Sequence, residues 1–382
     1  MELIKLIKLG EDSTRQFKKN VTNADSLAAD MAAFSNGSGG IILIGVNDDG
    51  SIAGLSDEDV RRLNQLISNT ASQNVQPAIN PVTENIMTDY GIVMVVNISS
   101  GINKPYQDKN GVFWVKSGAD KRKATSREEI QRLFQKANLI HADELPVSGT
   151  TAADLDLDYF KTFFQNRFGE TLDEQELPLT KILENMNLLK DGALNIAGTL
   201  LFAKTPQFKL PIYMVKAVAL DANEFGTDNY SDSRNIEGKM EYVYKQTVSF
   251  IVSNLRHIQG EQGFNSIGIP EIPAVSISEI VANALMHRDY FISAPVRVFI
   301  FRNRVEIISP GHLPNNLTIE NIKAGNSNAR NTILTSHASH ILPYRGIGSG
   351  IISALAKFPD IDFFDDRDGN LFKVTFKRKE LL

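Results

Sequence analysis

The chain has 382 residues, 42% of them hydrophobic and 22% charged, and its formal net charge at pH 7 is −5. This length suffices for two or three domains with substantial cores, and the composition is that of an ordinary globular protein. Cysteine is absent, which excludes disulfides and thiolate metal sites, and the net charge argues against an overall basic coat for nucleic acid, although a local patch needs only a few cations.

The sequence also bears on the compartment. No apolar run approaches the roughly 20 residues that cross a bilayer. The first residues include lysines but lack the apolar core and the cleavage site of a signal peptide. We therefore expect a cytoplasmic protein without membrane contact.

Residues 1–140 alternate between predicted helices and strands. Helices are expected at 26–35, after a capping box at Ser56 and after Ser126, and strands at 41–46, 92–98 and 112–116. Leu27, Met31 and Phe34 recur at helical spacing, whereas 41–46 is a continuous apolar run, which is typical of a buried strand. The pattern predicts an α/β domain.

Seven cations of this region are the candidates for contact with nucleic-acid phosphates. They are Lys18, Lys19, Lys116, Lys121, Arg122, Lys123 and Arg127. Phe113 and Trp114 lie beside the second group, and aromatic rings among cations can stack on bases. Because an alternating strand more often buries such rings, a core role is the stronger interpretation for the two aromatics. For the run 121–123, a solvated loop and a phosphate site are equally good interpretations.

Three segments of this region resemble the Schlafen/AlbA-like domain. They are Phe17-Lys18, the stretch from Leu27 to Gly40, and Gly45-Val46-Asn47-Asp48-Asp49-Gly50. The resemblance implies a mixed-sheet, nucleic-acid-binding domain over 1–140 and, in Schlafen proteins, a metal-dependent RNase site with three carboxylates. Glu11 matches the first acid, Gln16 stands at the second, and Asp48 or Asp49 lies near the third. Two-metal chemistry needs several carboxylates around cations about 4 Å apart, so we do not expect an efficient nuclease.

Residues 141–275 carry no evident chemistry. The polar stretch 141–156 contains proline, serine and glycine and is predicted to be a linker. In 157–275 we expect helices at 157–168, 179–189 and 240–255, and strand-like or buried segments at 195–202 and 212–220. The motif from Gly198 to Pro206 resembles the RecG-like family, which assigns this part to the second domain.

Residues 276–382 contain the chemically most suggestive helix, predicted from Ser276 to Arg288, with Ser276 or Ser278 as its cap. Glu279 and Asn283 are four residues apart, which places a carboxylate and an amide on one face. A carboxylate can polarise a water molecule, and an amide oxygen is a hard ligand suited to Mg²⁺.

The rest of this region predicts a phosphate-binding pocket. Strands at 295–301 and 304–308 form a hairpin that brings Ser309-Pro310-Gly311 to the end of a strand. Gly346, Gly348 and Gly350 precede a helix at 351–358, where backbone N–H groups suit phosphates. The long polar segment 314–342 is typical of a lid, and a last hairpin turns at Asp368-Gly369.

This order of motifs resembles the GHKL ATPase superfamily, and the run from Asn283 to Tyr290 resembles its RecG-like branch of transcriptional regulators. The resemblance implies an α/β sandwich over 157–382 that binds ATP and Mg²⁺. Glu279 would be the general base and Asn283 the Mg²⁺ ligand. The glycines 346, 348 and 350 would form the phosphate lid, and Ser309 and Gly311 would lie beside the adenine base of ATP. The superfamily usually has aspartate at the position of Ser309, and this departure opposes adenine recognition.

Three functions follow from these features. The first is a homo-oligomeric regulator that binds nucleic acid, DNA in preference to RNA, in which ATP closes the segment from Asn316 to Arg345 and changes DNA binding or assembly; weak ATPase activity would accompany it. The second is a binding or assembly scaffold whose nucleotide pocket is degenerate, as Ser309 suggests. The third, opposed by Gln16, is a Schlafen-like nuclease in phage defence.

Overall fold

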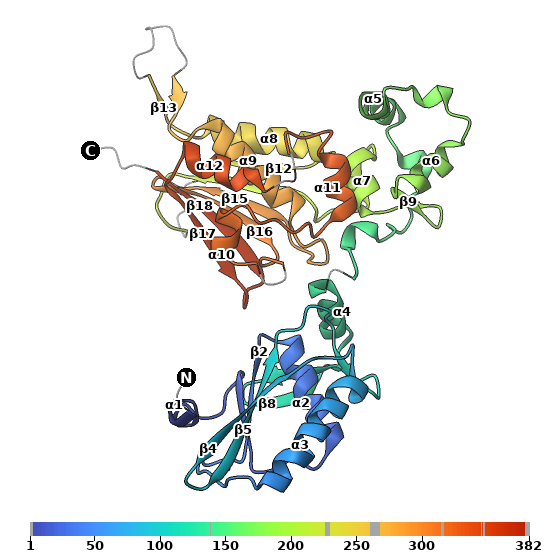
Figure 1. Cartoon of the computed structure of the whole chain (residues 1–382). Coiled ribbons are helices and arrows are strands. Elements are labelled where there is room, and N and C mark those ends of the chain that lie inside the picture. The colour runs from blue at the N-terminus through green and yellow to red at the C-terminus, as the bar shows by residue number, and fades with distance from the viewer. Residues whose placement is uncertain are drawn as a thin grey trace. The chain divides into compact units, whose positions relative to one another are not determined.

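A computed structural model describes residues 3–137, 139–225, 230–259, 268–314, 317–344, 346 and 348–378. The chain forms two compact units, residues 1–140 and 141–382 (Figure 1). Each unit combines helices with mixed sheets, which confirms the predicted α/β class. None of the helices in the described ranges has both the length and the apolar character that a bilayer crossing requires.

The first unit is built on a four-stranded sheet in the order β1-β2-β5-β4. The strands are β1 (Arg15–Lys18), β2 (Gly39–Ile44), β5 (Gly91–Ser99) and β4 (Val82–Thr88). β1 and β2 are parallel and the other pairs antiparallel. Helices α2 (Ala24–Asn36) and α3 (Asp57–Asn69) cover one face, while α1 (Leu3–Lys8) packs on the other (Figure 1).

Local sequence explains where these helices begin. The Asn23 side chain accepts hydrogen bonds from the backbone N–H groups of Asp25 and Ser26 and caps α2. At α3, Ser56 and Asp59 form the predicted capping box, in which each side chain satisfies a backbone N–H of the other residue.

Further elements of this unit are four short strands, which pack against α2, and one helix that follows them in the chain. They are β3 (Val75–Gln76), β6 (Gln107–Asp108), the hairpin of β7 (Trp114–Ser117) and β8 (Asp120–Lys123), and α4 (Arg127–Lys136). The buried Asn36 side chain donates to the carbonyls of Tyr106 and Trp114 and accepts from the N–H of Tyr106. This amide fixes the hairpin to the end of α2.

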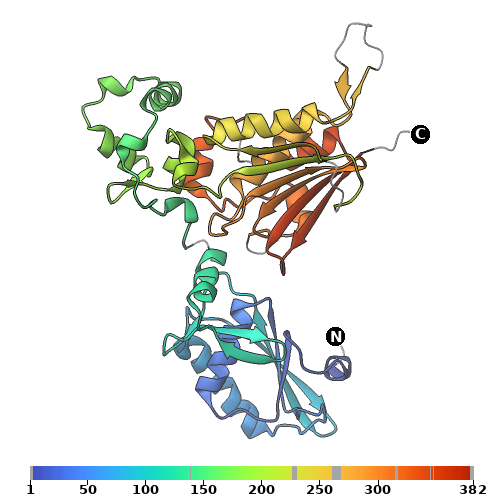
Figure 2. The same cartoon turned by 180° about the vertical axis from the view of Figure 1, so that it is seen from behind.

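The second unit is built on a six-stranded sheet in the order β12-β11-β15-β16-β18-β17. The strands are β12 (Tyr230–Ile236), β11 (Val215–Leu220), β15 (Val296–Ile300), β16 (Arg304–Pro310), β18 (Leu371–Lys377) and β17 (Ile361–Asp366). Only β11 and β15 are parallel among these pairs. Helices α8 (Met240–Ser253), α9 (Ala274–Met286) and α12 (Ser349–Lys357) lie along one face, which gives the predicted sandwich (Figures 1 and 2).

Shorter elements complete this unit. They are α5 (Leu157–Phe168), α6 (Leu179–Asn185), β9 (Leu189–Lys190), β10 (Ala193–Leu194), α7 (Ile196–Phe202), β13 (His257–Ile258), β14 (Ile269–Pro270), α10 (Ile319–Lys323) and α11 (Thr332–Ala338). The segment 195–202, which the sequence suggests as a strand, is therefore mostly helix. Every residue of α7 is buried, so no polar face reveals a helical period, and Asn195 caps it by accepting from the N–H of Gly198.

Residues 141–156, which the sequence predicts to be a linker, contribute side chains to the second unit. Ala142, Val147 and Leu155 are buried in the core of the second unit. Thr150 is also buried, and its hydroxyl donates to the carbonyls of Val147 and Leu194. Two predicted ends of the lid, Asn316 and Arg345, lie outside the described residues.

Candidate functional site

Helix α9 presents three polar side chains to a cavity of about 760 Å³. Glu279, Asn283 and His287 follow one another at intervals of four residues and so lie on one face. The helix begins at Ala274 after Pro273, so the predicted serine cap is wrong. Ser276 is fully buried and its hydroxyl donates to the Ala354 carbonyl at 3.0 Å, which fastens α9 to α12.

The structure brings the residues predicted for nucleotide binding to this one cavity. Its lining includes Glu279, Asn283, Ser309, Gly311, Gly346, Gly348 and Gly350. They come from α9, from the end of β16 and from the start of α12, three segments that are distant in the chain. A helix face, a strand end and a glycine loop thus line the same cavity.

Two of the glycines permit close backbone approaches. A Cβ at Gly350 would lie 2.6 Å from Oε2 of Glu279, so a bare α-carbon lets the start of α12 meet the carboxylate. Gly348 has φ +76° and caps α12, and a Cβ there would lie 1.8 Å from the carbonyl oxygen of Gly325. Gly348 requires glycine for space, because the obstructing atom is backbone, and for its left-handed conformation, whereas at Gly350 the obstructing atom is the end of a side chain.

Ser309 has its hydroxyl engaged with the helix. Its Oγ donates to the carbonyl of Ala284 at 3.0 Å, and the residue is buried. The hydroxyl hydrogen is therefore used within the protein, and the oxygen keeps only the capacity to accept. An aspartate would offer two acceptor oxygens instead, so this site provides a weaker partner for an amino group.

Arg330, which the sequence does not single out, holds the strand end in place. Its guanidinium donates to the carbonyls of His312 at 2.6 Å and His287 at 3.4 Å. A Cβ at Gly311, whose φ is +98°, would collide with this guanidinium. Asn331 then donates to the carbonyls of Met286 and Arg288, which satisfies the C-terminal end of α9. Two residues inside the predicted lid segment, Arg330 and Asn331, are thus bonded directly to the backbone around the cavity.

His287 and Tyr344 form a hydrogen-bonded pair at the cavity, with 2.8 Å between Nε2 and the phenolic oxygen. Burial, with a contribution from the Arg330 charge, lowers the pKa of His287 to about 4. Burial also raises the pKa of Tyr344 to about 12. At neutral pH both are uncharged, so this pair supplies hydrogen-bonding groups rather than charge.

Arg288, which follows the helix, is not part of the cavity lining. It is 2% exposed and lies between the rings of Tyr213 and Tyr290, at 4.7 and 4.8 Å from their centroids. Its guanidinium donates to the carbonyls of Ile292 and Ala294. Its role here is to hold the segment after α9.

The cavity combines an apolar floor with a polar rim. The apolar lining includes Ile280, Ile307, Ile322, Phe363, Phe372 and Val374. Asn283 donates through Nδ2 to the Glu279 carbonyl at 2.8 Å, so its Oδ1 is the end of the amide that can accept or coordinate. One amide oxygen beside a carboxylate fits Mg²⁺ that arrives with phosphates and water, because that ion needs few protein ligands.

In the first unit, the structure separates the seven predicted cations into paired and unpaired groups. Asp30, 1% exposed on α2, lies 2.8 Å from Nζ of Lys121 and 4.0 Å from Nζ of Lys18. Gln16, in the amide orientation that suits its neighbours, bridges Asp30 and Lys18 at 3.1 Å each. Two of the cations therefore neutralise a buried carboxylate.

Two more cations are engaged locally. Arg122 forms a two-pronged pair with Glu129, at 2.6 and 2.9 Å. Lys116 lies over the Phe34 ring at 4.7 Å and donates to the Ala119 carbonyl. Burial lowers the pKa of Lys116. Lys19, Lys123 and Arg127 are exposed, and none of them forms an ion pair with the part of the chain that the structure describes.

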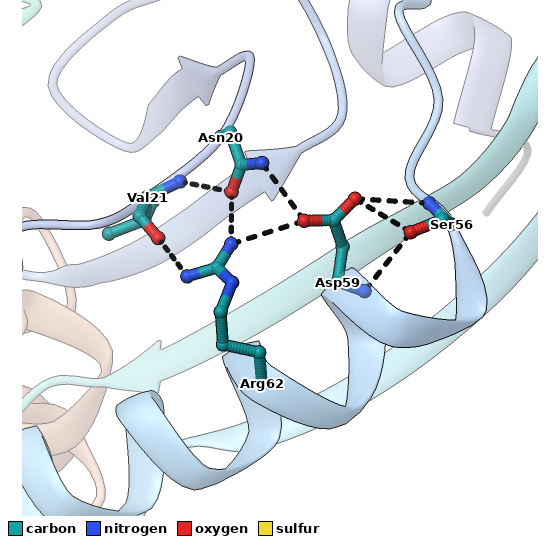
Figure 3. A network of polar contacts seen from close by, with 5 residues as sticks. All are labelled: Asn20, Val21, Ser56, Asp59 and Arg62. Carbon is teal, nitrogen blue, oxygen red and sulfur yellow. Dashed lines mark hydrogen bonds and ion pairs between the residues drawn. The ribbon is translucent and has the colours of Figure 1, made fainter.

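The loop that carries Lys19 is held by a polar network (Figure 3). Arg62 donates to the Val21 carbonyl at 2.8 Å and to Oδ1 of Asn20 at 2.6 Å, and Asn20 donates to Asp59. Hydrogen bonds from Ser56, Asn20 and Arg62 lower the pKa of Asp59 to about 2. A loop fixed to α3 in this way presents Lys19 at a defined position.

Trp114 at the start of β7 and Phe113 just before it follow the core interpretation. Trp114 packs against the core below α2, and its Nε1 donates to Asp108 at 2.9 Å. Phe113 meets Phe134 edge to face at 5.6 Å. Lys123 lies over the Trp114 ring at 5.5 Å, so the exposed side of this ring is already covered by a cation.

The acids of the Schlafen resemblance are placed as follows. Oε1 of Glu11 accepts from the N–H of Phe17 at 2.7 Å. Across the described ranges, no three His, Asp or Glu side chains are arranged to hold a metal ion. Asp30 could have been found from the sequence, because it is a carboxylate inside the apolar stripe of Leu27, Met31 and Phe34.

Two family models match the chain. Residues 11–125 match the model described as "Schlafen, AlbA_2", and residues 293–376 match the model described as "Putative ATP-dependent DNA helicase recG C-terminal". The chain therefore carries a Schlafen/AlbA-type domain followed by a RecG C-terminal-type domain, as predicted. This combination is that of a nucleic-acid-related, ATPase-like protein.

The comparison with solved structures gives a fainter likeness. The DIP2311 protein from Corynebacterium diphtheriae is 20% identical, with 96% of this chain and 75% of that chain covered, at a TM-score of 0.46. A score at this level does not establish a common fold over the whole length. The chain matches no curated protein.

Proposed function

We propose that this chain is a regulator that binds nucleic acid through its first unit and ATP with Mg²⁺ through its second. The nucleotide state of the second unit modulates DNA binding or the assembly of a homo-oligomer. The observation that carries this proposal is the convergence of Glu279, Asn283 and the glycines of α12 on one cavity.

The cavity supports specific roles for its residues. Asn283 would hold Mg²⁺ through Oδ1, and the N–H groups at the start of α12 would bind phosphate oxygens. Glu279 would orient and deprotonate a water molecule if ATP is hydrolysed. Mg²⁺ would supply charge neutralisation for the phosphates.

Calorimetric titration of Mg-ATP into the full chain tests the pocket. We expect saturable binding to the wild type and affinity lower by about 10-fold or more in Asn283→Ala, since a metal ligand is lost. Asn223→Ala, an exposed amide on the same unit, is the matched control. Glu279→Gln should keep binding and lose hydrolysis. Failure of the folded wild type to bind would contradict the nucleotide part of the proposal.

The exposed cations of the first unit support the nucleic-acid part. Lys19, Lys123 and Arg127 are the candidates with charge left to neutralise phosphates. Binding to a labelled DNA duplex is measured by anisotropy at several salt concentrations. The slope of log affinity against log salt concentration should decrease in magnitude by about one for each contacting cation removed. Repeating the titration with a single-stranded RNA and with saturating Mg-ATP tests the preference for DNA and the modulation. Equal binding with and without nucleotide would leave no modulation to propose.

One observation favours a second candidate, a binding or assembly scaffold with a degenerate pocket. The Ser309 hydroxyl donates to the Ala284 carbonyl, so the adenine base of ATP would lack the carboxylate partner that the superfamily usually offers. In this case Mg-ATP would not bind to the folded wild type, while the oligomer measured by light scattering would be independent of nucleotide.

A further inference from the structure

A second cleft of the 141–382 unit, about 420 Å³ in volume, shares no lining residue with the nucleotide cavity. Its charged residue is Arg167, near the end of α5. Burial lowers the pKa of this guanidinium, and no carboxylate of the described chain is close enough to offset that effect. A half-buried arginine without a counter-ion is costly, and a bound anion would remove that cost.

His337 on α11 fixes the orientation of Arg167. One terminal nitrogen of the guanidinium, Nη1, bonds to Nδ1 of His337, and Nε2 of His337 lies 2.9 Å from the carbonyl of Met186. A guanidinium can only donate, so Nδ1 is the acceptor and Nε2 carries the hydrogen that is donated to Met186. Burial, together with the charge of Arg167, lowers the pKa of His337 to about 4, so the imidazole is neutral near pH 7.

This bond leaves one edge of the guanidinium available. Nη1 is used by His337, whereas Nε and Nη2 have no hydrogen bond to the described residues and are not enclosed. These two N–H groups point in parallel and match the spacing of two oxygens on a carboxylate or a phosphate. The rings of Phe163 and Phe168 lie 5.9 and 5.2 Å from the guanidinium carbon and support its position.

The rest of the cleft is neutral and rich in donors. Its polar lining consists of Asn185, Asn187, Thr332 and Ser336, and no acidic side chain is among the described residues that line it. Amides and hydroxyls can donate to an anion that the arginine holds. The apolar contacts come from Phe168, Met186 and Ile333.

We propose that this cleft between α5, α6 and α11 is a second ligand site, which binds a small oxyanion, a carboxylate or phosphate group, on the Nε–Nη2 edge of Arg167. The shared chemistry of the ligand is a pair of anionic oxygens, and a planar or apolar remainder would lie against Phe168. This cleft is separate from the cavity that Glu279 and Asn283 line.

Thermal unfolding of the full chain, with inorganic phosphate in one series and malonate in another, tests this site at constant ionic strength. A ligand of the native state raises the midpoint in a saturable way. We expect such a rise with one or both anions in the wild type, and apparent affinity lower by about 10-fold or more in Arg167→Gln. The series that responds identifies the group as tetrahedral or planar.

Two further variants make the result decisive. Lys190→Gln removes one exposed positive charge from β9 and should bind like the wild type. Arg167→Lys keeps the charge and can still donate to His337 but lacks the fork, so it should also weaken binding, and it serves as the test if Arg167→Gln does not fold. Absence of a saturable response in the wild type, or an undiminished response in the folded Arg167 variants, would overturn the proposal.

Discussion

Gly350 and Glu279 meet where α12 begins, and a Cβ added at Gly350 would stand 2.6 Å from Oε2 of the carboxylate. The same added atom would lie 3.2 Å from Nδ2 of Asn283. The start of α12 therefore lies against Glu279 and Asn283 of α9. A side chain at position 350 would therefore change the position of the Glu279 carboxylate.

The variant Gly350→Ala should separate stability from ligand binding. The obstructing atom is the end of a flexible side chain that can turn away, and alanine gains about 1 kcal/mol of helix propensity over glycine. We expect the free energy of unfolding to stay within about 1 kcal/mol of the wild type while Mg-ATP affinity falls by about 10-fold.

Chemical denaturation and calorimetry check these two quantities. Gly37→Ala is the matched control, because a Cβ there meets neighbours no closer than 3.4 Å. Unchanged affinity in the folded Gly350→Ala protein would show that the position of Glu279 does not matter for the nucleotide.

Gly348→Ala should be far more destructive than Gly346→Ala. Both residues have positive φ, +76° and +68°, so alanine is strained at either position. At Gly348 the Cβ would also stand 1.8 Å from the backbone oxygen of Gly325, whereas at Gly346 the nearest atoms lie at 3.6 Å and beyond.

We expect Gly346→Ala to cost about 1 kcal/mol of unfolding free energy and Gly348→Ala about 3 kcal/mol or more. Urea unfolding of the two variants measures the difference. Equal losses would mean that the contact between Gly348 and Gly325 is easily relieved.

Asp143 gives the second unit an unusual pH dependence. The residue is fully buried and accepts from the N–H of Leu334 at 2.8 Å, and its burial raises the pKa from 3.8 to about 6. The folded state then holds this proton at pH values where the unfolded state has lost it. Asp143 therefore favours folding at low pH, and its contribution is lost as the pH rises from about 4 to about 6, by about 3 kcal/mol in total.

Asp143→Asn keeps an acceptor for Leu334 but removes the titration. Its unfolding free energy relative to wild type should increase between pH 4.5 and 7, by up to about 3 kcal/mol. Urea unfolding at several pH values measures this difference. Asp368→Asn, which makes the same substitution at an exposed turn between β17 and β18, is the matched control. A constant difference for Asp143→Asn would show that its carboxyl titrates alike in both states.

Lys121 and Lys123 should respond differently although they are two residues apart. Lys121→Ala leaves the buried Asp30 with the neutral Gln16 amide and the distant Lys18 as partners, so we expect a loss of about 1–3 kcal/mol in unfolding free energy. Lys123→Ala removes an exposed cation and should change stability by less than about 0.5 kcal/mol, while duplex affinity and its salt slope decrease.

Denaturation and anisotropy on the same two variants check this contrast. A Lys123→Ala protein with wild-type affinity and salt slope would remove Lys123 from the nucleic-acid surface. An undiminished stability of Lys121→Ala would mean that Asp30 is paired or hydrated in another way.

Much of the local structure could be predicted because it depends on neighbours in the chain. Helical spacing places Glu279 and Asn283 on one face whatever surrounds the helix. The capping box at Ser56 and the hairpins on either side of residues 302–303 and 368–369 are also local, and all of them are present. The prediction of a strand-like segment at 195–202 was wrong because α7 is buried on every side, so its sequence shows no helical period.

Only the tertiary structure decided which distant groups meet. Packing alone places Gly348 against Gly325 and pairs Lys121 with the buried Asp30. Packing also brings His337 to Arg167, which orients the guanidinium toward a cleft. Such contacts join segments separated by tens of residues, and no repeat or spacing along the chain encodes their distance. Composition and motif order therefore determined the two domain types, while the packing of the core determined which of the candidate residues remain available to a ligand.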